Sequence, residues 1–424
     1  MNRLIIKNIG PINNVDFQVN RLNVIIGKQS SGKSTIAKIL SFCLWLEKDV
    51  IAHQQKDYIN ESFIKKQFLD YHKINNYLND GAFVHYEGDY ISFTFRGMKD
   101  FSISLKEGFA QSKTGKVAYI PAERNLVALT KISGLDMERN YVRDFLFNWL
   151  SIHGKFTRDQ AVPIIDLGIS YYYDTDTNKD RIVLHDGKEM DIEDVSSGMQ
   201  SVIPLFVYLK YILEWIFENE DDTSYDKYSV LQKALLRSVS PDIDDQLMTR
   251  ALSAPELKKK LLDNLKLLKN ISKEKISDEA LVSVSDLEER IGTPHYATLI
   301  IEEPELNLFP STQIKLIYEI LKGTNFDRDR LLLTTHSPYT LYAINNCMLG
   351  YKVKDKLDSD DKRNLSSIQS CINPDIVSVW QINNNGELCD IKNSPAGIIG
   401  KHYFNEVMNE ALNEYHLMLN YVEL

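Results

Sequence analysis

The chain has 424 residues, of which 43% are hydrophobic and 25% are charged, and it carries a formal net charge of −10 at pH 7. This composition is ordinary for a globular protein of two or three domains, and the acidic balance excludes a surface that is basic throughout. Because no apolar run approaches the roughly 20 residues that cross a membrane, and the four cysteines lack metal-ligand spacing, we expect a cytoplasmic protein without a membrane partner.

The first 46 residues predict two strands, a glycine-rich loop and a helix. The strands are expected at 3–7 and 22–26, with turn residues at 10–14, and the helix is expected at 35–46. The loop between the second strand and the helix fits the pattern G-x-x-x-x-G-K-[ST] without a mismatch. Its residues are Gly27, Lys28, Gln29, Ser30, Ser31, Gly32, Lys33 and Ser34.

This strand, loop and helix predict a binding site for a nucleotide and Mg²⁺. Backbone N–H groups of such a loop converge on phosphate oxygens, and the helix N-terminus adds partial positive charge. Lys33 would reach the β- and γ-phosphates, and the Ser34 hydroxyl would ligate Mg²⁺. Thr35, the next residue, belongs to the same binding segment.

Strands and helices continue to alternate after the loop. Residues 47–80 predict polar helical structure, and the apolar segments 82–86 and 90–95 predict a hairpin. Further strands are predicted at 101–105, 116–120, 164–173 and 181–185, with mainly helical structure over 125–160. Another helix is predicted to begin after residues 196–198 and to end near residue 218.

Residues 220–296 are charged and poor in glycine, and they predict an inserted helical subdomain. A leucine stripe with lysines around it at 257–269 is either a face for DNA or a partner, or a helix packed on the core. Beyond the insertion, strands are predicted at 298–301, 331–335 and 376–382, helices at 313–321, after 337 and at the C-terminus, and a charged loop at 354–366. The expected organisation is therefore 1–219, 220–296 and 297–424 around an α/β core.

Two acidic residues end the predicted strand at 298–301. Glu302 can hold the Mg²⁺ shell, and Glu303 is placed to orient or deprotonate an attacking water. The alternative is an acidic pair that faces solvent. The phosphate loop upstream favours the catalytic interpretation, since Mg²⁺ would make the adjacent like charges tolerable.

Two further segments have positions typical of ligand contacts. His336 follows the predicted strand at 331–335, and ligands bind at the carboxyl ends of strands in α/β sheets. Ser196, Ser197 and Gly198 precede a helix, where they form either a second anion site or a simple serine N-cap. A second anion site in one chain suggests that two chains share nucleotides.

In this order, the motifs resemble those of the ATP-binding-cassette ATPases, and in particular the SMC/RecF/OLD-like branch. Glu302–Pro310 resembles the E-E-P-E-x-x-L-x-P motif of that branch, and Tyr119–Arg124 resembles its Y-I-P-A-E-R segment. The resemblance implies a P-loop NTPase fold of the ABC ATPase type, with a mixed sheet, an antiparallel β subdomain and a helical insertion. It also implies ATP and Mg²⁺ as cofactors, and hydrolysis of ATP to ADP and phosphate.

The resemblance further implies that two chains dimerise head to tail with ATP between them. Ser196 and Gly198 of one chain would then contact the γ-phosphate held by the other, and His336 would donate a hydrogen bond to it. Stand-alone ATPases of this kind act with a separate nuclease or toxin effector in anti-phage defence. A homodimer or higher oligomer and a partner effector are therefore expected by analogy.

Several residues depart from the family pattern. Met199 occupies the place of the usual signature glutamine, Glu302 replaces an aspartate, and no Q-loop glutamine is evident where Ala122, Glu123 and Arg124 lie. Residues 305–309 replace the usual D-loop, and 124–196 is too short to hold a long coiled coil. Residues 337–424 lack a convincing acidic cluster of a C-terminal nuclease domain, because Asp358 and Asp360 lie in a polar loop.

Three functions are compatible with these motifs. The leading hypothesis is an ATPase whose ATP-driven dimerisation controls a partner effector. An alternative is a DNA-repair or chromosome-maintenance ATPase that binds DNA directly. A third is the nucleotide-binding subunit of a membrane transporter, which the insertion and the altered Q-loop region disfavour.

Overall fold

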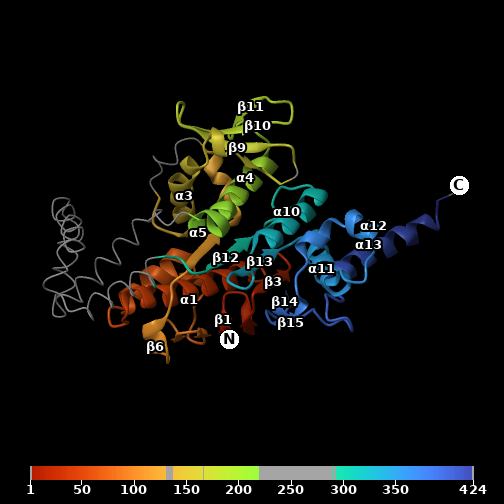
Figure 1. Cartoon of the computed structure of the whole chain (residues 1–424). Coiled ribbons are helices and arrows are strands. Elements are labelled where there is room, and N and C mark those ends of the chain that lie inside the picture. Colours follow the sequence, from red (N-terminus) through yellow and green to blue (C-terminus); the bar gives the residue numbers. More distant parts are fainter. Residues whose placement is uncertain (1, 130–136, 166, 219–289, 291–292, 423–424) are drawn as a thin grey trace.

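The computed structural model describes residues 2–129, 137–165, 167–218, 290 and 293–422 (Figure 1). Nearly all of the predicted helical insertion at 220–296, including the leucine and lysine stripe at 257–269, lies outside the described residues. The division of the chain into 1–219, 220–296 and 297–424 therefore stays a prediction.

A six-stranded sheet forms the centre of the molecule, with the strand order β15–β14–β3–β13–β12–β7. Its strands are β3 (Leu22–Gly27), β7 (Lys116–Ile120), β12 (Ala297–Glu302), β13 (Arg330–Thr335), β14 (Val377–Ile382) and β15 (Leu388–Asp390). All pairs are parallel except β14 with β15 at one edge. Every residue of β3 and β12 is buried, as expected for strands covered on both faces. The predicted α/β class and mixed sheet are thus confirmed.

Two antiparallel sheets accompany the central sheet. The larger has the order β2–β1–β4–β5–β6, and the smaller has the order β11–β10–β9–β8. The larger contains β1 (Asn2–Ile9), β2 (Ile12–Val19), β4 (Phe83–Glu87), β5 (Ile91–Arg96) and β6 (Asp100–Leu105). The smaller contains β8 (Val162–Pro163), β9 (Ser170–Asp174), β10 (Lys179–Val183) and β11 (Glu189–Asp191). These sheets confirm the predicted antiparallel strands.

Helices cover the sheets and connect their strands (Figure 1). They are α1 (Lys33–His53), α2 (Glu61–Ile64), α3 (Tyr141–Ile152), α4 (Ser197–Lys210), α5 (Ile216–Glu218), α10 (Pro310–Gly323), α11 (Pro338–Val353), α12 (Ser359–Asn364) and α13 (Tyr403–Leu419). A π-helical segment follows each of two helices: Lys65–Asp70 comes after α2, and Tyr211–Trp215 comes after α4. A 3₁₀ segment, Ala122–Ala128, follows β7.

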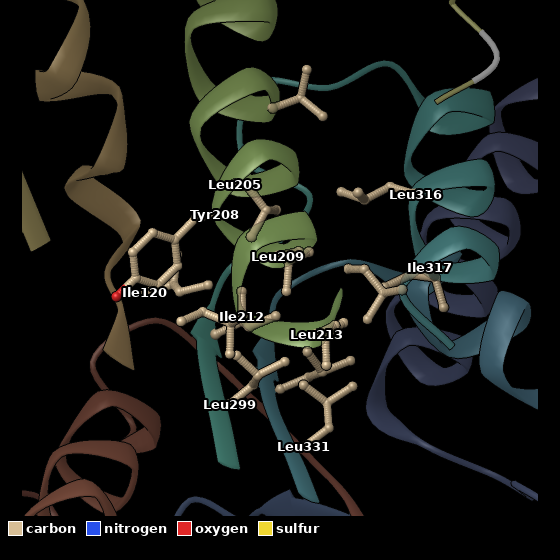
Figure 2. Close-up of a cluster of buried hydrophobic side chains, with 14 of the residues drawn as sticks. Ile120, Leu205, Tyr208, Leu209, Ile212, Leu213, Leu299, Leu316, Ile317 and Leu331 are labelled. Atoms are coloured by element: carbon tan, nitrogen blue, oxygen red, sulfur yellow. The ribbon is translucent and has the colours of Figure 1, made fainter. Parts of the chain in front are cut away.

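The two faces of the central sheet pack against different layers. Leu331 and Leu333 of β13 belong to a core with α3, α4, α10 and α11, whereas Leu332 belongs to a core with α1 and the larger antiparallel sheet. Figure 2 shows α4 and the turn after it lying over β12 and β13, with α10 beside them. The labelled side chains there are Ile120, Leu205, Tyr208, Leu209, Ile212, Leu213, Leu299, Leu316, Ile317 and Leu331. Along α4 they recur at helical spacing, as an apolar stripe does.

The helical stretch Ser197–Glu218 is long and apolar enough to cross a membrane, with a mean hydropathy of 1.2. However, 61% of its most apolar window is buried inside the structure. Because this stretch packs on the central sheet (Figure 2), its role in the protein core accounts for its apolar character.

Two local predictions were wrong. Residues 12–14, which were expected in a turn, belong with 15–19 to β2, because Ile12, Val15 and Phe17 are buried between polar neighbours. The helix expected at 35–46 is α1, which continues to residue 53 within the segment 47–80 that was also expected to be helical, and its Glu47 is buried and accepts from Tyr86 Oη at 2.7 Å. The charged loop expected at 354–366 contains the short helix α12, whose N-cap is Asp358.

Candidate functional site

The carboxyl ends of adjacent parallel strands bring the predicted motifs to one edge of the central sheet. In the strand register, Thr335 of β13 lies beside Ile26 of β3, and Glu302 of β12 lies beside Thr334. The glycine loop after β3, the histidine after β13 and the acidic pair at the end of β12 are therefore neighbours. β7, on the other side of β12, delivers the segment 121–124 to the same edge. This edge is the usual ligand site of an α/β sheet.

Residues 27–34, here called the P-loop, form a tight turn that leads into α1. Gly32 caps α1 with a φ of 105°, a conformation that disfavours residues with a side chain. A Cβ atom at Gly32 would lie 2.8 Å from Ile12 Cγ1, and one at Gly27 would lie 2.6 Å from Ser31 Oγ. Gly32 is thus required by both its backbone conformation and its close contact, whereas a side chain at Gly27 would require the Ser31 hydroxyl to move. The arrangement directs the N-terminus of α1 at the loop, as an anion site requires.

The Lys33 ammonium group lies across the P-loop. Its Nζ donates to the carbonyl oxygens of Gly27 and Lys28, each at 3.0 Å, and lies 3.5 Å from Nδ1 of His336. Lys33 is only 4% exposed. Burial lowers its pKa from 10.5 to about 8, against the opposing effect of three nearby glutamates. A contact with a phosphate oxygen would stabilise the charged form of this buried ammonium group.

Glu302 and Ser34 fit a hard divalent cation. The Glu302 side chain is buried, and its Oε1 atom has no hydrogen-bond partner among the described residues. Burial raises the pKa of this carboxyl group, while the hydroxyls of Ser34 and Tyr119, which face it, oppose the rise. Mg²⁺ prefers oxygen ligands of this kind, and its charge would compensate the buried carboxylate. The predicted pair of metal ligands therefore lies together, with a carboxylate oxygen available.

Glu303 and His336 face each other beside Lys33. Glu303 Oε1 lies 3.4 Å from His336 Nε2, and each side chain is 31% exposed. Burial and the nearby Lys33 lower the pKa of His336 below its usual range, so the ring is neutral at pH 7. Because an ammonium group can only donate, a hydrogen bond from Lys33 to Nδ1 requires the tautomer with its proton on Nε2, on the side of Glu303.

Glu305 also belongs to the site, although the sequence assigned it no role. Its Oε1 accepts from the backbone N–H of His336 at 2.7 Å and from Thr335 Oγ1 at 2.8 Å. These bonds fix the backbone that carries His336. Its other oxygen, Oε2, is buried without a hydrogen-bond partner among the described residues, and burial raises the pKa of the carboxyl group. The available signal was its place as the third acid of the Glu302–Pro310 motif.

Arg124 is the residue whose importance the sequence revealed least. Its guanidinium group is fully buried, and burial lowers its pKa to about 10. All five N–H groups face backbone carbonyls. Nε donates to Ser201 O at 3.0 Å, and Nη1 donates to Pro121 O at 3.3 Å and Glu302 O at 2.9 Å. Nη2 donates to Glu303 O at 2.7 Å and Pro304 O at 3.3 Å. Arg124 therefore connects α4 to the acidic end of β12.

The segment Ser196–Gly198, here called the signature segment, lies at the start of α4. Ser196 is the N-cap and accepts from Met199 N at 3.4 Å, which agrees with the simpler of its two sequence interpretations. Ser196 and Ser197 are exposed. A Cβ atom at Gly198 would lie 2.7 Å from Asn307 O, so this glycine permits close backbone approach. Among the described residues, no hydrogen bond joins the signature segment to the P-loop of the same chain.

Comparison with known proteins gives one family match. A family model described as an AAA domain matches residues 3–293. No curated protein matches the chain.

Several solved structures are similar to this one. The SMC head domain from Thermotoga maritima has 10% identity, with 92% of this chain and 98% of that chain covered and a TM-score of 0.37. An Smc head domain with an extended coiled coil, bound to the C-terminal domain of ScpA derived from Pyrococcus furiosus, has 8% identity, coverage of 98% and 100%, and a TM-score of 0.37. The recombination mediator protein RecF has 10% identity, coverage of 92% and 97%, and a TM-score of 0.30. At TM-scores below 0.5, these likenesses carry no argument about this chain.

Proposed function

We propose that this chain, which belongs to the AAA domain family, binds ATP with Mg²⁺ and hydrolyses ATP to ADP and phosphate at a site shared by two copies of the chain. Membership of the family supports ATP as the nucleotide and ATPase activity as the reaction class.

One observation carries this proposal. Lys33, Glu303 and His336 form a continuous series of polar contacts, with separations of 3.5 Å and 3.4 Å, beside the P-loop. The buried Glu302 and the facing Ser34 lie next to this series. A phosphate-binding loop, a pair of metal ligands and a carboxylate that can position water are groups that phosphoryl transfer to water uses, and His336 adds a hydrogen-bond donor beside them.

Each group has a distinct role in this proposal. The backbone of residues 27–35 and the Lys33 ammonium group bind the phosphates, and Ser34 and Glu302 hold Mg²⁺, which neutralises phosphate charge. Glu303 orients the attacking water and accepts its proton. His336 donates a hydrogen bond from its Nε2–H group to a γ-phosphate oxygen.

We propose that the signature segment acts on the P-loop of a second copy. The support is that Ser196 and Ser197 are exposed at a helix N-terminus, where partial positive charge favours phosphate. The segment has no hydrogen bond to its own P-loop among the described residues. Head-to-tail pairing would use Ser196, Ser197 and Gly198 to complete the partner's site.

The substitution Glu303→Gln tests the assignment. It removes the proton acceptor, so we expect kcat to fall by about 100-fold or more, with ATP affinity retained and an ATP-bound dimer accumulating in size-exclusion chromatography. Glu107→Gln is the matched control, because this exposed residue lies in the turn after β6. Full ATPase activity of Glu303→Gln, or no dimer enrichment with ATP, would contradict the proposal.

We further propose that opening and closing of this dimer controls a separate effector, a nuclease or toxin, in cytoplasmic anti-phage defence. The support is the resemblance of Tyr119–Arg124 and Glu302–Pro310 to segments of stand-alone ATPases of that kind. Recovery of an effector by Glu303→Gln from the native host, with ATP and not without it, is the expected result. A DNA affinity that depends on salt and rises with ATP would instead favour the DNA-maintenance alternative.

A further inference from the structure

The last described helix, α13, presents an apolar stripe that no other part of the described structure covers. The stripe, here called the α13 stripe, consists of Met408, Leu412, Tyr415 and Leu419. These side chains are 57%, 45%, 54% and 43% exposed, in that order. No residue of α13 is buried. Figure 1 shows α13 projecting from the body of the molecule toward the C-terminus.

Only the N-terminal end of α13 contacts the rest of the described structure. The backbone N–H of Tyr403 donates to Gln381 Oε1 at 2.9 Å, and His402 and Asn405 form a capping box. Residues 406–420 are exposed throughout. Helices in proteins are stabilised mostly by packing of an apolar face, and α13 makes little such packing with the rest of the described structure. A partner that covered the stripe would therefore stabilise it.

The spacing of the α13 stripe is that of a coiled-coil seam. Its members follow one another at intervals of four, three and four residues, which places them at successive core positions of a heptad pattern. The acidic residues Glu406, Glu410 and Glu414 follow one another at intervals of four, and they fall on the opposite face. The opposite face therefore carries the three glutamates, together with the exposed Leu417.

The residues that flank the α13 stripe indicate what covers it. In paired helices, charges beside the seam select the partner and its orientation. Here the flanking residues are Asn409 and His416 on one side and Ala411 and Met418 on the other, and none is a carboxylate or a strong base. These flanking positions offer no permanently charged side chain with which a charged partner helix could form ion pairs. Two α13 helices can pair through the stripe without like charges meeting beside it, because their glutamates lie on the opposite face.

We propose that α13 pairs with α13 of a second copy of this chain, through the α13 stripe and without any requirement for nucleotide. This contact is isologous, since the same surface is used by both copies. It is separate from the ATP-dependent contact proposed above, so a chain that makes both contacts builds assemblies larger than a dimer.

Size-exclusion chromatography with light scattering, carried out without nucleotide, tests this pairing. We use the Lys33→Ala background, so that failure of the ATP-dependent contact has no influence on the result. The expected mass is twice the 48.9 kDa of one chain, and the double variant Leu412→Glu/Leu419→Glu is expected to give half that mass. Glu410→Gln/Glu414→Gln, on the opposite face, is the matched control and should keep the paired mass. Because α13 has no buried residue, circular dichroism should show that all variants keep the folded core.

Cysteine cross-linking identifies the occupant directly. In a Cys389→Ser background, which removes the exposed native cysteine, Leu412→Cys/Tyr415→Cys should form a covalent pair of chains under mild oxidation. Glu410→Cys/Asn413→Cys, with the same spacing on the opposite face, should not. A single-chain mass for the Lys33→Ala protein, a paired mass that survives Leu412→Glu/Leu419→Glu, or cross-linking only to a different protein would each overturn the proposal.

Discussion

Replacing Arg124 tests how the site is held together. The structure gives this buried guanidinium five N–H groups and five carbonyl acceptors, on Pro121, Ser201, Glu302, Glu303 and Pro304. Lysine has three N–H groups, so Arg124→Lys loses at least two of these five hydrogen bonds, although Glu303 O keeps the backbone N–H of Leu306 as a donor. A hydrogen bond to a charged group contributes about 1.5–3 kcal/mol, so we expect the free energy of unfolding to fall by about 3–6 kcal/mol.

The effect on activity should exceed the effect on nucleotide binding. Arg124 contacts the backbone at Glu302 and Glu303, and none of its hydrogen bonds within the described residues goes to the P-loop. We therefore expect kcat to fall by at least tenfold in Arg124→Lys, while the affinity for ATP measured by calorimetry stays within a few-fold of wild type. Urea denaturation measures the loss of stability.

Arg3→Lys is the matched control for Arg124→Lys. Arg3 is exposed and pairs with Asp16 at 2.6 Å on the surface, so its replacement should change stability little. If Arg124→Lys unfolds at the wild-type urea concentration and hydrolyses ATP at the wild-type rate, the reasoning that Arg124 positions the acidic end of β12 is refuted.

Three further predictions follow from the site. Burial lowers the pKa of Lys33 to about 8, so ATP affinity measured by calorimetry should be constant below that pH and fall as the pH rises above it. The variant Lys33→Ala should bind ATP weakly at every pH. A wild-type affinity that does not change up to pH 9.5 would contradict this prediction. Gly198→Ala would place a Cβ 2.7 Å from Asn307 O, so it should destabilise the fold by about 1–3 kcal/mol and reduce ATP-dependent dimerisation, and an unchanged melting temperature would count against the close approach. Glu305→Ala removes the acceptor of the His336 N–H, so kcat should fall while Glu305→Gln keeps more activity, and equal activities in the two variants would exclude a positioning role.

Much of the central sheet and the P-loop could be predicted from the sequence because their signals are local. Leu22–Ile26 is an uninterrupted apolar run, as strands buried on both faces are. The residues of 27–34 carry their own conformational requirements, above all at Gly32. Glu302, Glu303 and His336 could be placed because each directly ends or follows such a strand.

The rest depended on contacts between distant segments. β2 was missed because its buried residues alternate with asparagine, aspartate and glutamine, which favour turns when read alone. Arg124 lies 77 residues from Ser201 and 179 residues from Glu303, so no local pattern indicates that its guanidinium joins them. The role of Glu305 likewise depends on a bond to His336, 31 residues away.

The central claim is that ATP is held between two copies of the chain, and mixing two inactive variants tests it most directly. Lys33→Ala disables the P-loop, and Ser197→Arg blocks the exposed signature segment while Ser196 is kept as the cap of α4. A mixed dimer contains one site with an intact P-loop from one copy and an intact signature segment from the other. Our account predicts no ATPase activity from either variant alone and measurable activity when they are mixed. Mixed dimers that form but stay inactive would contradict it.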